Sequence, residues 1–206
     1  MNTSITLILL VITVILSIAA LSNEQLLRKW LFNPYLINHQ KQFYRFFTSG
    51  FIHADWVHLF VNMFVLYGFG QLVESYYNAY FDDKASYYFV LLYLGGVLIS
   101  NAPSYVKHKE HPWYNSLGAS GAVSGILFAA ILFDPWQKIY LFAVLPLPGI
   151  LLGPLYLFYE WKSGQQQRDN INHDAHFWGA IFGLLFTVVL KPVIIVTFLD
   201  RLIHRI

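Results

Sequence analysis

The stretch "GASGAVSGILFAAILF", residues 118–133, joins two unlike halves. The second half is wholly apolar and suits the core of a helix that crosses a bilayer. The first half places one serine, Ser120, among glycines and alanines, which allow neighbouring backbones to approach closely. A serine in this position is either a packing residue or a nucleophile, and the stretch alone leaves both interpretations open.

The composition of the whole chain supports a membrane location. Of its 206 residues, 57% are hydrophobic and 12% are charged, about half the charged fraction of a soluble domain. The net charge of +2, without a lysine or arginine cluster, gives no reason to expect a nucleic-acid partner. The absence of cysteine excludes disulfides, thiolate metal sites and a cysteine nucleophile.

The apolar segments predict an all-α membrane protein in which six transmembrane helices form one domain, residues 1–206. The segment between the first two spans is polar and aromatic, so we expect it to lie at the membrane interface. The tail, residues 191–206, is too short to cross again and is predicted to extend the last helix or form an amphipathic end. The expected spans are residues 3–21, 56–73, 87–100, 118–133, 139–159 and 174–190.

Polar residues gather where the second, fourth and sixth spans begin. These three beginnings must lie on one side of the membrane, because two crossings separate each from the next. His58 and Asn62 are four residues apart and project from one helix face. Polar groups inside a membrane are costly and are functional-site hypotheses by default. The set that converges is His53, His58, Asn62, Ser120 and His176.

The chemistry open to this set is limited. Without cysteine, the available nucleophile is Ser120, activated by a histidine of the sixth span. Donors for an oxyanion would come from the first N–H groups of the fourth span and from the side chains of His58 and Asn62. Gly118 and Gly121 flank the serine and permit a tight turn beside a substrate.

Three motifs, in this order, resemble those of rhomboid intramembrane serine proteases: "HADWVHLFVN" (53–62), "GASG" (118–121) and "AHFWGAIFG" (175–183). The resemblance implies an endopeptidase that cleaves the transmembrane segments of other proteins within the lipid bilayer. It implies Ser120 as the nucleophile and His176 as its general base. It implies neither a cofactor nor a metal.

The same resemblance assigns further roles. It implies that His58 and Asn62 line the oxyanion hole together with the backbone N–H of the nucleophile, and that His53 is a near-site or structural residue. The position one turn after the nucleophile is often aromatic in the family and supports the catalytic histidine. Here that position is Ser124, so another group is expected to support His176.

Small residues recur at four-residue spacing in the fourth and sixth spans. Such patterns let membrane helices approach closely, and a close contact here would bring the serine to the histidine. The residues are Gly121, Gly125, Gly179 and Gly183.

No carboxylate is evident as a partner for His176. Asp174 lies two residues away, about 200° around the helix, and so points elsewhere. His173 is interpreted as a solvated loop residue. We therefore predict a Ser–His dyad with modest turnover.

Two other functions use the same polar cluster. One is a zinc-dependent membrane hydrolase, although no H-E-x-x-H motif is present. Its ligands would be His53, His58, His173 and His176. The other is a transporter or channel, favoured by the prolines that interrupt the fifth span.

The resemblance also implies a location. It predicts an integral multi-pass protein, of a bacterial plasma membrane, with its active site toward the outside. The lysines and arginines are more numerous in the segments that would then lie outside. This distribution favours the opposite orientation.

Overall fold

The computed structural model describes residues 4–141, 144–166, 169 and 171–204, and these are mostly helical. The elements, in chain order, are α1 (Ile5–Leu21), α2 (Glu24–Trp30), α3 (Pro34–Gln40), α4 (Arg45–Thr48), η1 (Ser49–Phe51), α5 (Trp56–Phe81), η2 (Asp82–Lys84), α6 (Ala85–His108), α7 (Ser120–Phe133), β1 (Lys138–Leu141), β2 (Leu145–Pro148), α8 (Gly149–Gln166), α9 (His173–Leu190) and α10 (Val193–His204).

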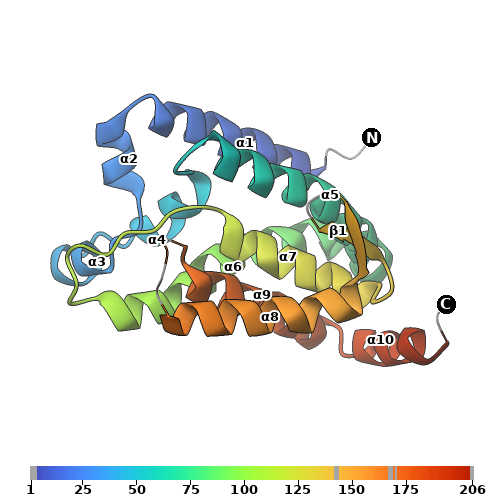
Figure 1. Ribbon diagram of the computed structural model, residues 1–206. Coiled ribbons are helices and arrows are strands. Elements are labelled where there is room, and N and C mark those ends of the chain that lie inside the picture. The colour runs from blue at the N-terminus through green and yellow to red at the C-terminus, as the bar shows by residue number, and fades with distance from the viewer. Residues whose placement is uncertain (1–3, 142–143, 167–168, 170, 205–206) are drawn as a thin grey trace.

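Helix α7 lies at the centre of the bundle (Figure 1), where it contacts α5, α6, α8 and α9. All of its residues except Ser120 and Leu127 are buried. A helix that is apolar on every side, as this one is, belongs in a core surrounded by other helices. Residues 120–133 of the stretch "GASGAVSGILFAAILF" are therefore the central helix of the fold.

The N-terminal ends of α5, α7 and α9 lie at one end of the bundle (Figure 1). The side chains of Asp55 and Asn172 cap α5 and α9 by accepting from backbone N–H groups. Before α7 the chain turns at Gly118, whose φ is +123° and whose N–H donates to the Ser49 carbonyl at 2.9 Å. Only glycine adopts this φ without strain.

By length and composition, two helical stretches of the described residues qualify as membrane crossings, Trp56–His108 and His173–Leu190. The first stretch includes both α5 and α6. Helices α1 and α7 are apolar but have only 17 and 14 residues. The six crossings predicted from the sequence are thus not established by this criterion.

Large apolar side chains nevertheless cover the outside of the bundle. On α5, Val57, Phe60 and Phe64 are each more than 60% exposed, and their spacing places them on one helix face. A continuous apolar face of this kind is unfavourable in water. It is a feature expected of a membrane protein.

The prediction for the fifth span is wrong at its beginning. Residues 138–141 and 145–148 pair as an antiparallel hairpin, and residues 142–143 lie outside the described residues. Pro146 and Pro148 have no backbone N–H to donate and fit poorly into a helix interior. Helix α8 therefore begins at Gly149, and it continues to Gln166, beyond the predicted end.

Other boundaries differ less. The first predicted span starts at Thr3, outside the described residues, and the segment after it folds into α2, α3 and α4. The tail forms a separate helix, α10, after Pro192 rather than an extension of α9, and residues 205–206 lie outside the described residues.

The segment between α1 and α5 is held by a buried arginine. Arg45 is 4% exposed. Its guanidinium donates to the carbonyls of Arg28 and Leu31 at 3.0 and 2.8 Å and to Oε1 of Gln42 at 2.7 Å. Hydrogen bonds from a charged donor are the stronger ones. This segment is therefore an ordered part of the fold.

Glu74 of α5 holds the beginning of α1. Its carboxylate accepts from the Ser4 hydroxyl at 2.5 Å and from the backbone N–H groups of Ile5 and Thr6 at 2.7 and 3.0 Å. A negative charge is favourable at a helix N-terminus. We expect Glu74→Gln to lower the free energy of unfolding by about 1–2 kcal/mol, measured by thermal unfolding in detergent. Glu24→Gln, which removes an exposed ion pair with Arg28, is the control and should change little.

Candidate active site

Ser120 and His176 meet at the end of the bundle where α7 and α9 begin. The Nε2 atom of His176 lies 2.7 Å from Oγ of Ser120. Ser120 is the first residue of α7, and His176 lies in the first turn of α9. A serine hydroxyl within hydrogen-bond reach of an imidazole is the geometry of an activated nucleophile.

The contact between α7 and α9 sets this distance. A Cβ atom added to Gly179 would meet the carbonyl oxygen of Gly121, and one added to Gly183 would meet that of Gly125. The two backbones thus touch directly over two helical turns, as the small-residue spacing suggests. Any side chain at these positions would separate the serine from the histidine.

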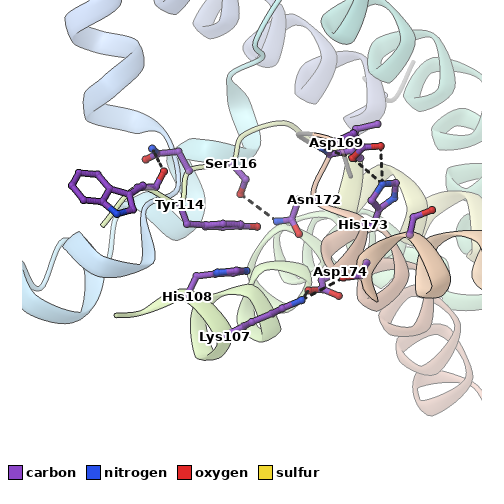
Figure 2. A pocket seen from close by; sticks show the side chains of 13 residues that line it. Lys107, His108, Tyr114, Ser116, Asp169, Asn172, His173 and Asp174 are labelled. Carbon is purple, nitrogen blue, oxygen red and sulfur yellow. Dashed lines mark hydrogen bonds and ion pairs between the residues drawn. The ribbon is translucent and has the colours of Figure 1, made fainter. Parts of the chain in front are cut away.

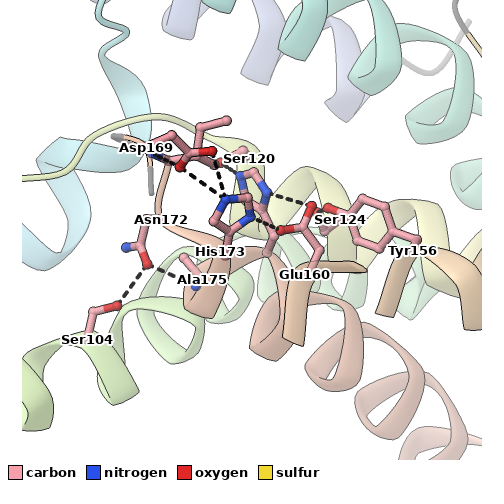
Figure 3. A network of polar contacts seen from close by, with 11 residues as sticks. Ser104, Ser120, Ser124, Tyr156, Glu160, Asp169, Asn172, His173 and Ala175 are labelled. Atoms are coloured by element: carbon pink, nitrogen blue, oxygen red, sulfur yellow. Dashed lines mark hydrogen bonds and ion pairs between the residues drawn. The ribbon is translucent and has the colours of Figure 1, made fainter. Parts of the chain in front are cut away.

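A carboxylate faces the other nitrogen of His176. Oε1 of Glu160, on α8, lies 3.1 Å from Nδ1 of His176, and Glu160 is 4% exposed. An ionised carboxylate only accepts, so Nδ1 carries the hydrogen and Nε2 is left with a lone pair toward Ser120. The expectation that no carboxylate orients this histidine is wrong. Figure 3 shows the network that joins Ser120 to Glu160.

His173 is the second partner of Glu160. Its Nδ1 lies 2.6 Å from Oε2 of Glu160, and its Nε2 lies 3.1 Å from Oδ1 of Asp169. The ring is 3% exposed, so the interpretation of His173 as a solvated loop residue is wrong. Both ring nitrogens face carboxylates and both are satisfied as donors when the ring is protonated.

Tyr156 of α8 contacts Ser124, the position of α7 at which the resemblance leads one to expect an aromatic residue. Its hydroxyl is 2.7 Å from Oγ of Ser124, which is buried. Tyr156 and Glu160 are four residues apart and therefore share one face of α8. One helix thus supplies both the carboxylate that contacts His176 and the ring beside Ser124 (Figure 3).

His53 links α1 to the loop before the nucleophile. Its Nδ1 lies 2.9 Å from Oγ of Ser17, and its Nε2 accepts from the N–H of Ala119 at 3.4 Å. Burial, with a smaller effect of His58, lowers the pKa of His53 to about 3. A neutral ring at this position can accept from Ala119 and so fixes the residue that precedes Ser120.

His58 and Asn62, which the sequence predicts as oxyanion-hole residues, differ from each other in their contacts. The His58 ring packs on Gly118, since a Cβ atom there would lie 2.7 Å from its Cε1. The buried amide of Asn62 donates to the carbonyl of His58 at 2.9 Å, within α5. His58 therefore lies close to the serine loop, whereas one amide hydrogen of Asn62 is used in its own helix.

Beside this network lies a polar cavity of about 340 Å³ (Figure 2). His173, Asn172 and Asp169 line it, and so does Lys107, which pairs with Asp174 at 3.1 Å. The Asp174 carboxylate is thus directed away from His176, as its position on the helix predicts. Its lining includes both the exposed Trp113 and the buried His173.

The profile of the Rhomboid domain matches residues 40–193, well over half of the chain. The chain belongs to the rhomboid family. The matched region of this rhomboid contains Ser120, Glu160, Asp169, His173 and His176.

Curated relatives agree with this assignment. Rhomboid-like protein 11, chloroplastic, of Arabidopsis thaliana is 29% identical over 76% of this chain and 56% of its own length. RHOMBOID-like protein 12, mitochondrial, of the same plant is 30% identical over 65% of this chain and 42% of its own. The presenilin-associated rhomboid-like protein, mitochondrial, of Homo sapiens is 29% identical over 67% and 35%.

The rhomboid chain thus spans about half, or less, of the length of these relatives. Their names place them in chloroplasts or mitochondria, which conflicts with the prediction of a bacterial plasma membrane.

Glu160 is the site residue that the sequence analysis missed. It is an acidic residue within the apolar run "GPLYLFYEW", residues 153–161. An ionisable residue in such a run is itself a functional-site hypothesis. The predicted fifth span ends at residue 159, one residue before this carboxylate, and so does not include it.

Proposed function

We propose that this rhomboid is an intramembrane serine endopeptidase in which Ser120 is the nucleophile and His176 the general base. The observation that supports this most is the chain of two contacts, 2.7 Å from Oγ of Ser120 to Nε2 of His176 and 3.1 Å from Nδ1 to Glu160. Nucleophile, base and orienting carboxylate in this order have the geometry of a catalytic triad.

The reaction follows from these contacts. The Ser120 hydroxyl gives its proton to Nε2 of His176 while Oγ forms a bond to the scissile carbonyl carbon. Nδ1–H continues to donate to Glu160, which stabilises the imidazolium that forms. The imidazolium then protonates the leaving amine, and the peptide bond breaks. Water, deprotonated by the same ring, releases the acyl group from Oγ.

The carbonyl oxygen becomes negatively charged during the attack and needs donors. The first N–H groups of α7, beginning with Ser120, have no acceptor within the helix. The positive end of the α7 dipole favours an anion at the same place. His58, packed on Gly118, can add a side-chain donor. Asn62 can do so with the amide hydrogen that is not bonded to His58.

The proposed substrates are transmembrane segments of other membrane proteins. An intact helix hides its carbonyls in hydrogen bonds, so cleavage needs a segment that unwinds locally near the site. We propose the six-span arrangement within the bilayer as the setting, in one domain, with the active-site end of the bundle toward the outside. The apolar face of α5 supports contact with lipid.

Labelling with a fluorescent fluorophosphonate tests this function. Purified protein in detergent is expected to label at Ser120, and both Ser120→Ala and His176→Ala should reduce the signal to background. Ser124→Ala, which removes a neighbouring buried serine of the same helix, is the matched control and should still label. Equal labelling of wild type and Ser120→Ala would contradict the proposal.

A further inference from the structure

We propose that Glu160, His173 and His176 form a zinc site, and that zinc bound there keeps His176 from acting as a base. The second part rests on the function proposed above. Among the described residues, these three are the group whose metal-binding atoms all lie within 4.8 Å of one another. Two imidazoles and one carboxylate are an established ligand set for zinc, with a fourth position open to water.

The geometry already approaches that of a bound ion. Tetrahedral zinc has bonds of about 2.0–2.1 Å to nitrogen and oxygen, which separates its ligand atoms by about 3.3 Å. The Nδ1 atoms of His173 and His176 lie 2.6 and 3.1 Å from the two oxygens of Glu160. Small side-chain movements would open this cluster around an ion, while the helices stay in place.

Each histidine also has the outer partner that metal ligands need. A coordinating imidazole usually donates its second N–H to a carboxylate or another acceptor, which fixes its orientation. Nε2 of His173 faces Asp169 at 3.1 Å, and Nε2 of His176 faces the Ser120 hydroxyl at 2.7 Å. Both partners are positioned to accept from rings bound through Nδ1.

Binding would change the hydrogen positions of His176. Zinc takes the Nδ1 lone pair, so the ring hydrogen must reside on Nε2, and any additional proton leaves to solvent. Nε2–H then donates to Oγ of Ser120 and has no lone pair for the serine proton. Zinc and a proton therefore compete for Nδ1 of His176. Only when Nδ1 carries the hydrogen does the neutral ring keep a lone pair on Nε2 that can accept the proton of Ser120.

An ion can reach the cluster from the cavity of Figure 2. This cavity is lined by Asp169 and His173, and its wall includes Trp113, which is 87% exposed. The carboxylate of Asp169 at its edge attracts a cation. The zinc hydrolase considered from the sequence would use His53 and His58 in addition to His173 and His176. The rings of His53 and His58 lie 4.9 Å apart between centroids, but the nitrogens of His53 face Ser17 and Ala119.

Cobalt binding tests the site without relying on activity. Titration of the detergent-solubilised full chain with Co²⁺ should produce the visible absorption of a tetrahedral ion, which Zn²⁺ then displaces. His173→Asn should abolish this absorption. Asp169→Asn, an exposed change that leaves the buried core intact, should weaken binding about tenfold. His108→Asn removes a buried imidazole of the same cavity and should bind as the wild type does.

Inhibition is measured separately by the rate of fluorophosphonate labelling. Zinc should reduce this rate in the wild type, and a chelator should restore it. If unliganded wild type does not label, the proposed protease function fails while the cobalt titration still decides the site. Cobalt spectra that are the same in wild type and His173→Asn would overturn the site. Zinc that binds but leaves labelling unchanged would overturn the inhibition.

Discussion

Replacing Glu160 with glutamine is expected to lower kcat by about 10²–10⁴-fold, as loss of the third member does in other catalytic triads. The Glu160 carboxylate accepts from His173 and His176 at the same time. An amide has one oxygen and one NH₂ group, so it cannot accept from both rings in this way. If the NH₂ group faces His176, Nδ1 must accept, and the hydrogen moves to Nε2, where it blocks proton transfer from Ser120.

The measurement is a steady-state cleavage assay of a transmembrane substrate in liposomes. A fall in kcat with KM within about twofold indicates loss of an interaction made in the transition state. Glu160→Asp keeps a carboxylate and should recover part of the rate. Asp174→Asn removes a carboxylate that pairs with Lys107 rather than with His176, so it serves as the control and should cleave at the wild-type rate. A Glu160→Gln protein that unfolds at the same temperature and cleaves at the wild-type rate would refute the positioning role.

The convergence of the three helix beginnings could be predicted from the sequence because it depends on parity alone. In the structure α5, α7 and α9 all begin at one end of the bundle (Figure 1), and Ser120 and His176 lie in the first turns of α7 and α9. Glycines spaced four residues apart in α7 and in α9 then allow these two helices to touch. This contact brings Oγ of Ser120 to 2.7 Å from Nε2 of His176.

Glu160 could not be placed in the same way because its position depends on where α8 begins. The sequence is apolar without interruption from residue 139. However, Pro146 and Pro148 belong to the second strand of a hairpin, and the helix begins only at Gly149. Hydropathy gives neither this start nor the direction in which Glu160 points. The interpretation of His173 fails for a related reason. A histidine at the start of a helix is expected to be solvated, and the sequence does not show that Glu160 and Asp169 lie beside its ring.

The contact of α7 with α9 leads to the second large effect. Gly179→Ala is expected to destabilise the fold by about 1–3 kcal/mol or more and to lower kcat/KM by about 10²-fold. The added methyl group would meet the Gly121 carbonyl oxygen and lie 2.7 Å from its carbon. These atoms are backbone, so they cannot rotate away, and the helices must separate by roughly 1 Å. A displacement of 1 Å at reacting groups costs about 10²-fold in rate.

Gly68→Ala is the matched control, since Gly68 also lies within a helix but has no atom within 4 Å of an added Cβ. Alanine is favoured over glycine inside helices, so this variant should be as stable as the wild type, or slightly more, and fully active. Thermal unfolding and substrate cleavage, measured on both variants, separate the packing effect from a general effect of glycine replacement. If Gly179→Ala behaves like Gly68→Ala, then direct backbone contact between α7 and α9 is not what holds Ser120 against His176.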